Sequence, residues 1–201
     1  VDYTVATTGT SAGDASADDF DPSGLPSGQV TIGAGDTLAD LTIALLDDNI
    51  VELDETFTVS LSNLQGGGSI SIDTAADTAT VNIENNDVTA LRILTADGPA
   101  TSVNESVGNS GLFFLSLSAE SSTDTTVTYS VGGDASVTDD YDAIPTTAVI
   151  PAGSQSVAIS VNVVDDTVIE NDEVISISLE STSNTDILVN LSLNDVADAT
   201  I

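Results

Sequence analysis

One sequence block occurs twice in this chain, and this repeat limits the possible folds more than any other feature. The block Leu45–Glu55 matches Val163–Glu173 at an offset of 118 residues. Shorter matches on both sides continue the alignment at offsets up to 126, as expected when loop lengths vary but the order of elements does not. Such self-similarity indicates two copies of one domain. We predict a first domain at 1–87 and a second at 88–201.

Both copies have the period-two pattern of β-strands. Apolar residues alternate with polar ones over 156–163, and the first copy repeats this pattern over 41–45. A second pair of alternating segments lies at 57–61 and 175–179. This alternation is typical of half-buried antiparallel strands, and clusters of Asn, Asp and Gly separate the segments. The predicted fold class is all-β, two tandem immunoglobulin-like antiparallel β-sandwiches, with a barrel as the lesser alternative.

The copies are expected to be incomplete in opposite ways. Residues 88–126 hold two further expected strands, near Leu91–Thr95 and Leu112–Ser118, that have no counterpart in the first copy. The first copy should therefore lack its N-terminal strands, and the second should lack its last strand. Two explanations are open: the chain is a piece of a longer array, or a neighbouring molecule supplies the missing strand to an exposed sheet edge.

The charge of the chain excludes several classes of function. It contains 33 Asp and Glu but only one basic side chain, Arg92, so the formal net charge is -32. Nucleic-acid binding requires cations that contact phosphates, and peripheral membrane binding requires a basic face. No run of about 18 apolar residues is present, so no membrane insertion is expected. Since Val1 is not an initiator methionine, we expect a mature product or a fragment.

The side chains that are absent also restrict the chemistry. The chain has no His, Cys, Met or Trp, and Arg92 accounts for its whole count of Lys and Arg. Histidine acid–base catalysis, cysteine nucleophiles and zinc sites made of His or Cys are therefore unavailable. With only 3% aromatic residues, a sugar-binding cleft for carboxylate catalysis is not expected. We predict a protein that is not an enzyme and whose ligands are oxygen atoms suited to hard cations.

The repeated block concentrates these oxygen ligands. In the first copy an apolar segment ends at Leu46, and Asp47, Asp48, Glu52 and Glu55 follow within nine residues. A hairpin bend here would bring the four carboxylates together, and each pair of like charges costs about 1 kcal/mol in water at ~4 Å. A bound cation removes that cost. Ca²⁺ accepts roughly 6–8 oxygen ligands in irregular geometry, so calcium is the predicted cofactor.

These motifs resemble those of the Calx-β family. Segments 45–57 and 163–175 are similar to the family's acidic block, with an acidic pair, a short apolar step, Glu and then Asp-Glu before a strand. The pairs Asp19-Phe20 and Asp140-Tyr141 resemble the acidic-aromatic element that precedes the block, and 151–153 resembles its Pro-x-Gly turn. The resemblance covers nearly the whole chain and implies immunoglobulin-like sandwiches that bind Ca²⁺ in acidic loops at one end.

Carried over position by position, the resemblance implies two sets of calcium ligands. The family's early Glu, in a Val-x-Glu context, is matched by Val103-Asn104-Glu105 in the second copy. The family's closing acidic triplet is matched by Asn85-Asn86-Asp87 in the first copy, where only Asp87 is acidic. The implied ligands of the first copy are Asp19, Asp47, Asp48, Glu52, Glu55 and Asp87. Those of the second copy are Glu105, Asp140, Asp165, Asp166, Glu170 and Glu173.

The expected function is structural. We predict a secreted or cell-surface bacterial protein that acts outside the cell as a calcium-stiffened spacer or filament-building unit. One alternative is a subunit of an extracellular fibre, sheath or surface layer that assembles by strand exchange. Another is a regulatory calcium sensor. The expected partners are calcium ions and neighbouring domains or copies of the same protein, without nucleic acid.

Overall fold

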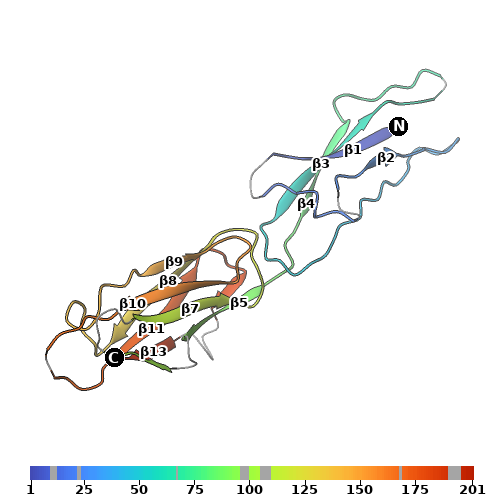
Figure 1. Cartoon of the computed structure of the whole chain (residues 1–201). Helices are drawn as coiled ribbons and strands as arrows, with labels where there is room; N and C mark the ends of the chain where they lie inside the picture. Colours follow the sequence, from blue (N-terminus) through green and yellow to red (C-terminus); the bar gives the residue numbers. More distant parts are fainter. Residues whose placement is uncertain are drawn as a thin grey trace. The chain divides into compact units, whose positions relative to one another are not determined.

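The chain folds entirely into β-strands and loops in the part that the structure describes (Figure 1). This computed structural model divides into two compact units. The first contains Val1–Asp48 and Leu53–Asn85, and the second contains Asn86–Ile201 with the short segment Asn49–Glu52. Within the described ranges, no helix has the length and hydropathy needed to cross a membrane. The described residues are 1–9, 13–21, 24–66, 68–95, 100–104, 110–167, 169–189 and 196–201.

The first unit contains one antiparallel sheet in the order β2-β1-β3-β4. Its small core lies against this sheet, where the rings of Phe20 and Phe57 meet edge to face with centroids 5.2 Å apart. The buried members of this core are Val5, Ala15, Phe20 and Phe57. The strands are β1 (Asp2–Thr7), β2 (Ser27–Gln29), β3 (Glu55–Ser62) and β4 (Thr78–Ile83).

The second unit contains two sheets, in the orders β10-β7-β5-β12 and β6-β13-β11-β8-β9. The first of these sheets is formed by β5 (Thr89–Thr95), β7 (Ser110–Leu117), β10 (Ser156–Asn162) and β12 (Ile187–Val189). The second is formed by β6 (Ala100–Ser102), β8 (Thr125–Gly133), β9 (Thr147–Ile150), β11 (Val174–Thr182) and β13 (Val196–Thr200).

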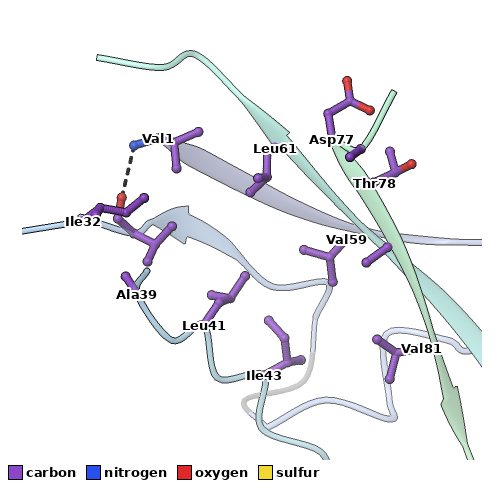
Figure 2. Close-up of a pocket in the computed structure, with 13 residues that line it drawn as sticks. Val1, Ile32, Ala39, Leu41, Ile43, Val59, Leu61, Asp77, Thr78 and Val81 are labelled. Atoms are coloured by element: carbon purple, nitrogen blue, oxygen red, sulfur yellow. Dashed lines mark hydrogen bonds between the residues drawn. The ribbon is translucent and has the colours of Figure 1, made fainter. Parts of the chain in front are cut away.

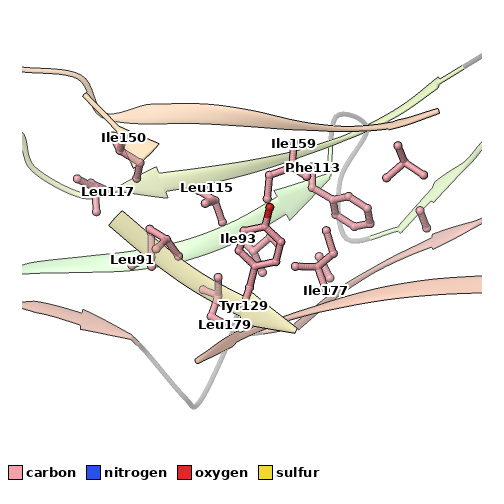
Figure 3. Packing of buried hydrophobic residues seen from close by; sticks show 14 of the residues in the cluster. Leu91, Ile93, Phe113, Leu115, Leu117, Tyr129, Ile150, Ile159, Ile177 and Leu179 are labelled. Atoms are coloured by element: carbon pink, nitrogen blue, oxygen red, sulfur yellow. The ribbon is translucent and has the colours of Figure 1, made fainter. Parts of the chain in front are cut away.

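Apolar side chains from both sheets form the core of the second unit (Figure 3). The strand β7 alternates between buried and half-buried residues, so that Phe113 and Leu115 face inward with no exposed surface. Tyr129 of β8 and Ile177 of β11 belong to the same buried cluster. This alternation confirms the predicted all-β sandwich, because burial of every second residue is what a sheet with one covered face requires.

Strand registers show which positions of the two units correspond. Val5 pairs with Val59 in the first unit and Val131 pairs with Ile177 in the second, which gives offsets of 126 and 118. Phe57 pairs with Val81 in the first unit, and Ile175 pairs with Ala199 in the second, so both members of the pair differ by 118. By the same offset, Ile201 corresponds to Ile83. The residues without a counterpart at the end of the second copy are therefore those that follow Ile83.

The alternating segment around Leu41 does not form a strand, although its pattern predicts one. Its counterpart β10 forms ladder pairs with one strand, β7. The first unit has no strand equivalent to β7 among its described residues. Since an isolated strand leaves its backbone groups without partners, residues 38–44 remain irregular and only Leu45 forms a single bridge, to Phe20.

Candidate metal centre

A buried aromatic residue anchors the site in each unit. Phe20 is fully buried and forms a bridge with Leu45, and Tyr141 is buried and forms the equivalent bridge with Val163. The N–H of Leu46 donates to the carbonyl of Asp19, and the N–H of Val164 donates to that of Asp140, both at 2.9 Å. These contacts attach each acidic-aromatic pair to the start of the repeated acidic block.

The carboxylates of Asp19 and Asp140 are held in the same way. The backbone N–H of Ser16 donates to Asp19 Oδ2, and the backbone N–H of Ser136 donates to Asp140 Oδ2. Asp140 is the only carboxylate that is buried as a whole residue among the described positions, with 4% of its surface exposed. Hydrogen bonds to a carboxylate leave lone pairs available for a metal, so both residues can act as ligands.

Three carboxylates converge in a first acidic cluster, formed by Asp19, Glu52 and Glu55. Each offers one oxygen, and these atoms all lie within 4.8 Å of one another. All three residues are half-buried, and Glu55 Oε2 has no exposed surface. Like charges held this close in a partly desolvated position repel one another strongly. Since only oxygen ligands are present, the arrangement fits a hard cation such as Ca²⁺.

A second acidic cluster surrounds Glu173, the counterpart of Glu55. Burial raises the pKa of Glu173 above its usual value, and a hydrogen bond with Asp140 adds to this increase. The negative charges of Asp140, Glu170 and Asp134 raise this pKa further. One oxygen, Glu173 Oε2, is buried and accepts no hydrogen bond from the described residues. A cation at this position would satisfy that oxygen and offset the repulsion.

Asp134 belongs to the second cluster, although the sequence motifs do not include it. Its N–H donates to the carbonyl of Val174 at 3.0 Å, and its Oδ1 accepts the N–H of Val174 at 2.6 Å. These bonds fix Asp134 at the start of β11, beside Glu173. The available signal was its position directly after Gly132-Gly133, shortly beyond the segment 127–131 that matches 1–5 at the offset of 126. Thr8 occupies the corresponding place in the first unit, at the offset of 126.

Other predicted ligands are not members of these clusters. Asp47, Asp48, Asp165 and Asp166 are all exposed in the loops that follow the bridged residues. Asp87 is half-buried and is not a member of the first acidic cluster. Glu105 lies outside the described residues. Of the predicted ligands, the structure brings together Asp19, Glu52 and Glu55 in one cluster. In the other, Glu173 forms a hydrogen bond with Asp140, and the negative charge of Glu170 raises the pKa of Glu173.

The raised pKa of Glu173 predicts how pH affects stability when no metal is bound. The pKa of Glu173 is higher in the folded state than in the unfolded state, so the protonated side chain stabilises the fold at pH values below its usual pKa. This stabilisation is lost as the pH rises through the folded-state pKa. Between pH 4 and pH 7 in EDTA, the wild type should lose free energy of unfolding relative to Glu173→Gln. Urea unfolding at several pH values measures this difference. Glu180→Gln, an exposed change in the strand β11 that follows Glu173, should track the wild type. Equal profiles for Glu173→Gln and the wild type would contradict the prediction.

Together the two units define a class of protein, an all-β chain with a repeated unit whose acidic clusters offer only oxygen ligands. Comparison with known families agrees with this class. The Calx-beta domain profile matches residues 2–87 and 89–201, and the chain belongs to the Calx-beta domain family. Calx-beta domains are a calcium-binding domain type and are in general not catalytic.

Individual relatives share parts of the chain. The "Adhesion G-protein coupled receptor V1" of Danio rerio is 41% identical over 61 residues, which cover 30% of this chain and about 1% of that protein's length. The apo form of the Calx CBD1 domain is 22% identical with a TM-score of 0.47, over 57% of this chain and 96% of that one. The calcium binding domain CBD12 of CALX1.1 is 25% identical with a TM-score of 0.45, over 55% and 44%.

Proposed function

We propose that this chain is a calcium-binding structural module without catalytic activity. The observation that carries the proposal is the convergence of Asp19, Glu52 and Glu55, whose carboxylate oxygens lie within 4.8 Å of one another. A protein that carries a net charge of -32 is destabilised by its own repulsion. Calcium bound at the half-buried carboxylates would remove the most costly part of this repulsion.

We further propose that the module acts outside the cell as a calcium-stiffened spacer. Extracellular calcium modules bind with Kd values of about 10⁻⁴ to 10⁻³ M, which match external calcium. Family membership supports calcium as the ligand, and one relative is an adhesion receptor by name. The tandem copies and the short join between them support the spacer role. The first family match ends at Asp87 and the next begins at Thr89, so Val88 alone separates them.

An assembly subunit is the second candidate function. It is favoured by the apolar face of the first unit, where Val81 is 40% exposed and Leu38 is 70% exposed. A large exposed apolar patch on a sheet marks a contact surface. In this candidate the chain joins an extracellular fibre, sheath or surface layer by accepting strands from neighbours. Sedimentation of the chain at rising concentration, with and without calcium, distinguishes it from a monomeric spacer.

Calcium titration during thermal unfolding tests the main proposal. With the Kd range given above, 10 mM free calcium should raise the free energy of unfolding by about 1.4–2.7 kcal/mol for each site. The corresponding rise in Tm is roughly 5 °C or more for a unit of this size. Magnesium at equal concentration should give a smaller rise, because its octahedral geometry and tightly held waters suit these clusters less well.

Paired variants assign the effect to the clusters. Asp19→Asn with Glu55→Gln should remove the calcium response of the first unit, and Asp140→Asn with Glu173→Gln should remove that of the second. Asp139→Asn with Glu180→Gln serves as the matched control, because it removes two exposed charges and should keep the response. A Tm that stays constant up to ~10 mM calcium would sink the proposal.

A further inference from the structure

One sheet of the second unit carries large apolar side chains on its outer side as well as in its core. In β5 buried residues alternate with exposed ones, so Arg92 and Leu94 point away from the core, and Leu94 is 43% exposed. In β7 the half-buried Phe114 lies between the buried residues Phe113 and Leu115. Since successive side chains of a strand point to opposite faces, Phe114 also faces outward.

Strand pairing aligns these outward residues in rows across β5, β7 and β10. Leu94 lies opposite Phe114, and Phe114 lies opposite Ala158. In the next row, Arg92 lies opposite Ser116, which lies opposite Ser156. Each row therefore has a large side chain on β5 and a small one on β10. We call this surface the outer face; it is formed by Arg92, Leu94, Phe114, Ser116, Ser156 and Ala158.

The outer face holds no carboxylate, although the chain has 33 acids. The outward residues of β5, β7 and β10 are apolar, hydroxyl or amide side chains together with Arg92, the only basic side chain of the sequence. The outer side of the opposite sheet, in contrast, exposes Glu180 and Asp198. Repulsion opposes contact between two copies with a net charge of -32 each, and it is weakest where both surfaces lack carboxylates.

A second exposed apolar surface, on the first unit, differs from the outer face in its charge. It is an open groove of about 390 Å³ whose lining includes Leu41, Val59 and Asp77 (Figure 2). Asp40 precedes Leu41 in the sequence and adds another acid. Two copies joined through this groove would bring these like charges together, at a cost that the outer face avoids. A second copy therefore fits the outer face better than the groove.

We propose that two copies of this chain pair through the outer face, sheet against sheet, about a two-fold axis parallel to β7. Phe114 then meets Phe114 of the second copy at the axis, and Leu94 of each copy lies over Ala158 of the other. Arg92 lies over Ser156 in the same way, so the two guanidinium groups are on opposite sides of the contact. A two-fold contact requires a surface that is complementary to itself, and rows with one large and one small end provide it.

The small size of the outer face predicts a weak pair. Each copy contributes two large apolar side chains, and interfaces below about 1,200 Å² are typical of weak, transient contacts. We expect a Kd of roughly 10⁻⁴ to 10⁻³ M. This pairing goes beyond the proposed calcium function and does not require calcium. A two-fold contact closes at the dimer, whereas a fibre assembled by strand exchange continues to grow.

Sedimentation equilibrium of the whole chain in EDTA tests the proposal, at concentrations up to about 2 mM. Salt at about 0.15 M screens the repulsion between copies. The wild type should form dimers and no larger species. Leu94→Glu should weaken the dimer by about tenfold or more, because it buries a carboxylate against an apolar surface. Ser130→Glu, the matched control, adds the same charge at an exposed residue of β8 and should leave the dimer unchanged.

An exchange of side-chain size tests the two-fold register. Leu94→Ala removes the large partner of Ala158, and Ala158→Leu makes two large side chains overlap, so each change should weaken the dimer by about threefold or more. The double variant again places one large and one small side chain at each contact and should pair within about twofold of the wild type. Both residues are exposed, so urea unfolding of the variants should match the wild type.

The outcomes separate this inference from the proposed functions. A dimer that Leu94→Glu weakens, that Ser130→Glu keeps and that the double size exchange restores supports pairing through the outer face. A chain that stays monomeric, equal dimers in all variants, or a double variant no stronger than the single ones would overturn it. The calcium-dependent rise in Tm should persist in every variant, so loss of the dimer with an intact calcium response concerns this inference alone.

Discussion

Replacement of Gly133 by alanine should unfold the second unit at much lower denaturant. Gly133 has a φ of 114°, in the region that side chains rarely adopt, and an added Cβ would lie 1.9 Å from the carbonyl oxygen of Val174. Both strain and overlap must be relieved by moving β8 away from β11. We expect a loss of roughly 2–5 kcal/mol in the free energy of unfolding.

The same change should also disturb the second acidic cluster. The close approach at Gly133 allows the N–H of Asp134 to donate to the carbonyl of Val174, the residue that follows Glu173. If β8 moves, Asp134 no longer lies beside Glu173, so the calcium response of this unit should fall together with its stability. Unfolding followed by tyrosine fluorescence reports on this unit through Tyr129 and Tyr141, since the chain contains no tryptophan.

Gly132 provides the matched control. A Cβ at Gly132 meets no atom within 4 Å, and its φ is not in the strained region. Gly132→Ala should therefore leave stability unchanged or raise it by up to about 1 kcal/mol, because glycine in a strand loses more entropy on folding than alanine. Equal losses for the two variants would show that the close approach at Gly133 does not hold.

Ile159→Ala should cost far more stability than the equivalent change Leu41→Ala in the first unit. Ile159 is 5% exposed in β10, which pairs with β7, and its truncation leaves a cavity in a packed core. Such truncations cost about 2–5 kcal/mol. Leu41 lies at the edge of an open groove, where water can fill the space left behind, so we expect a loss of at most about 1 kcal/mol.

Urea unfolding of both variants measures this difference. If Leu41→Ala proves as costly as Ile159→Ala, Leu41 must be as well covered in the first unit as Ile159 is in the second, which would contradict the open groove.

Most of the fold could be predicted from local patterns. The alternation over 156–163 and the repeat at offset 118 depend on neighbouring residues and on chain order, and both are readable in the sequence. The same holds for Asp19 and Asp140, because each precedes an aromatic residue that must be buried. The strand predicted over 41–45 was wrong, because alternation indicates which face is apolar but not whether a neighbouring strand is present to pair with it.

For the acidic clusters, too, part could be predicted from the sequence and part could not. The sequence determined that five acids recur in each block and that only oxygen ligands are available, because these properties are composition and spacing. It could not determine that Glu52 and Glu55 meet Asp19 while Asp47 and Asp48 remain exposed in their loop.

Tertiary structure decided that outcome, and it also placed Asp134 beside Glu173. Both results depend on the register between strands far apart in the chain, such as β8 with β11. Packing of a whole sheet sets that register, so it decides which carboxylates are desolvated together and can share a cation.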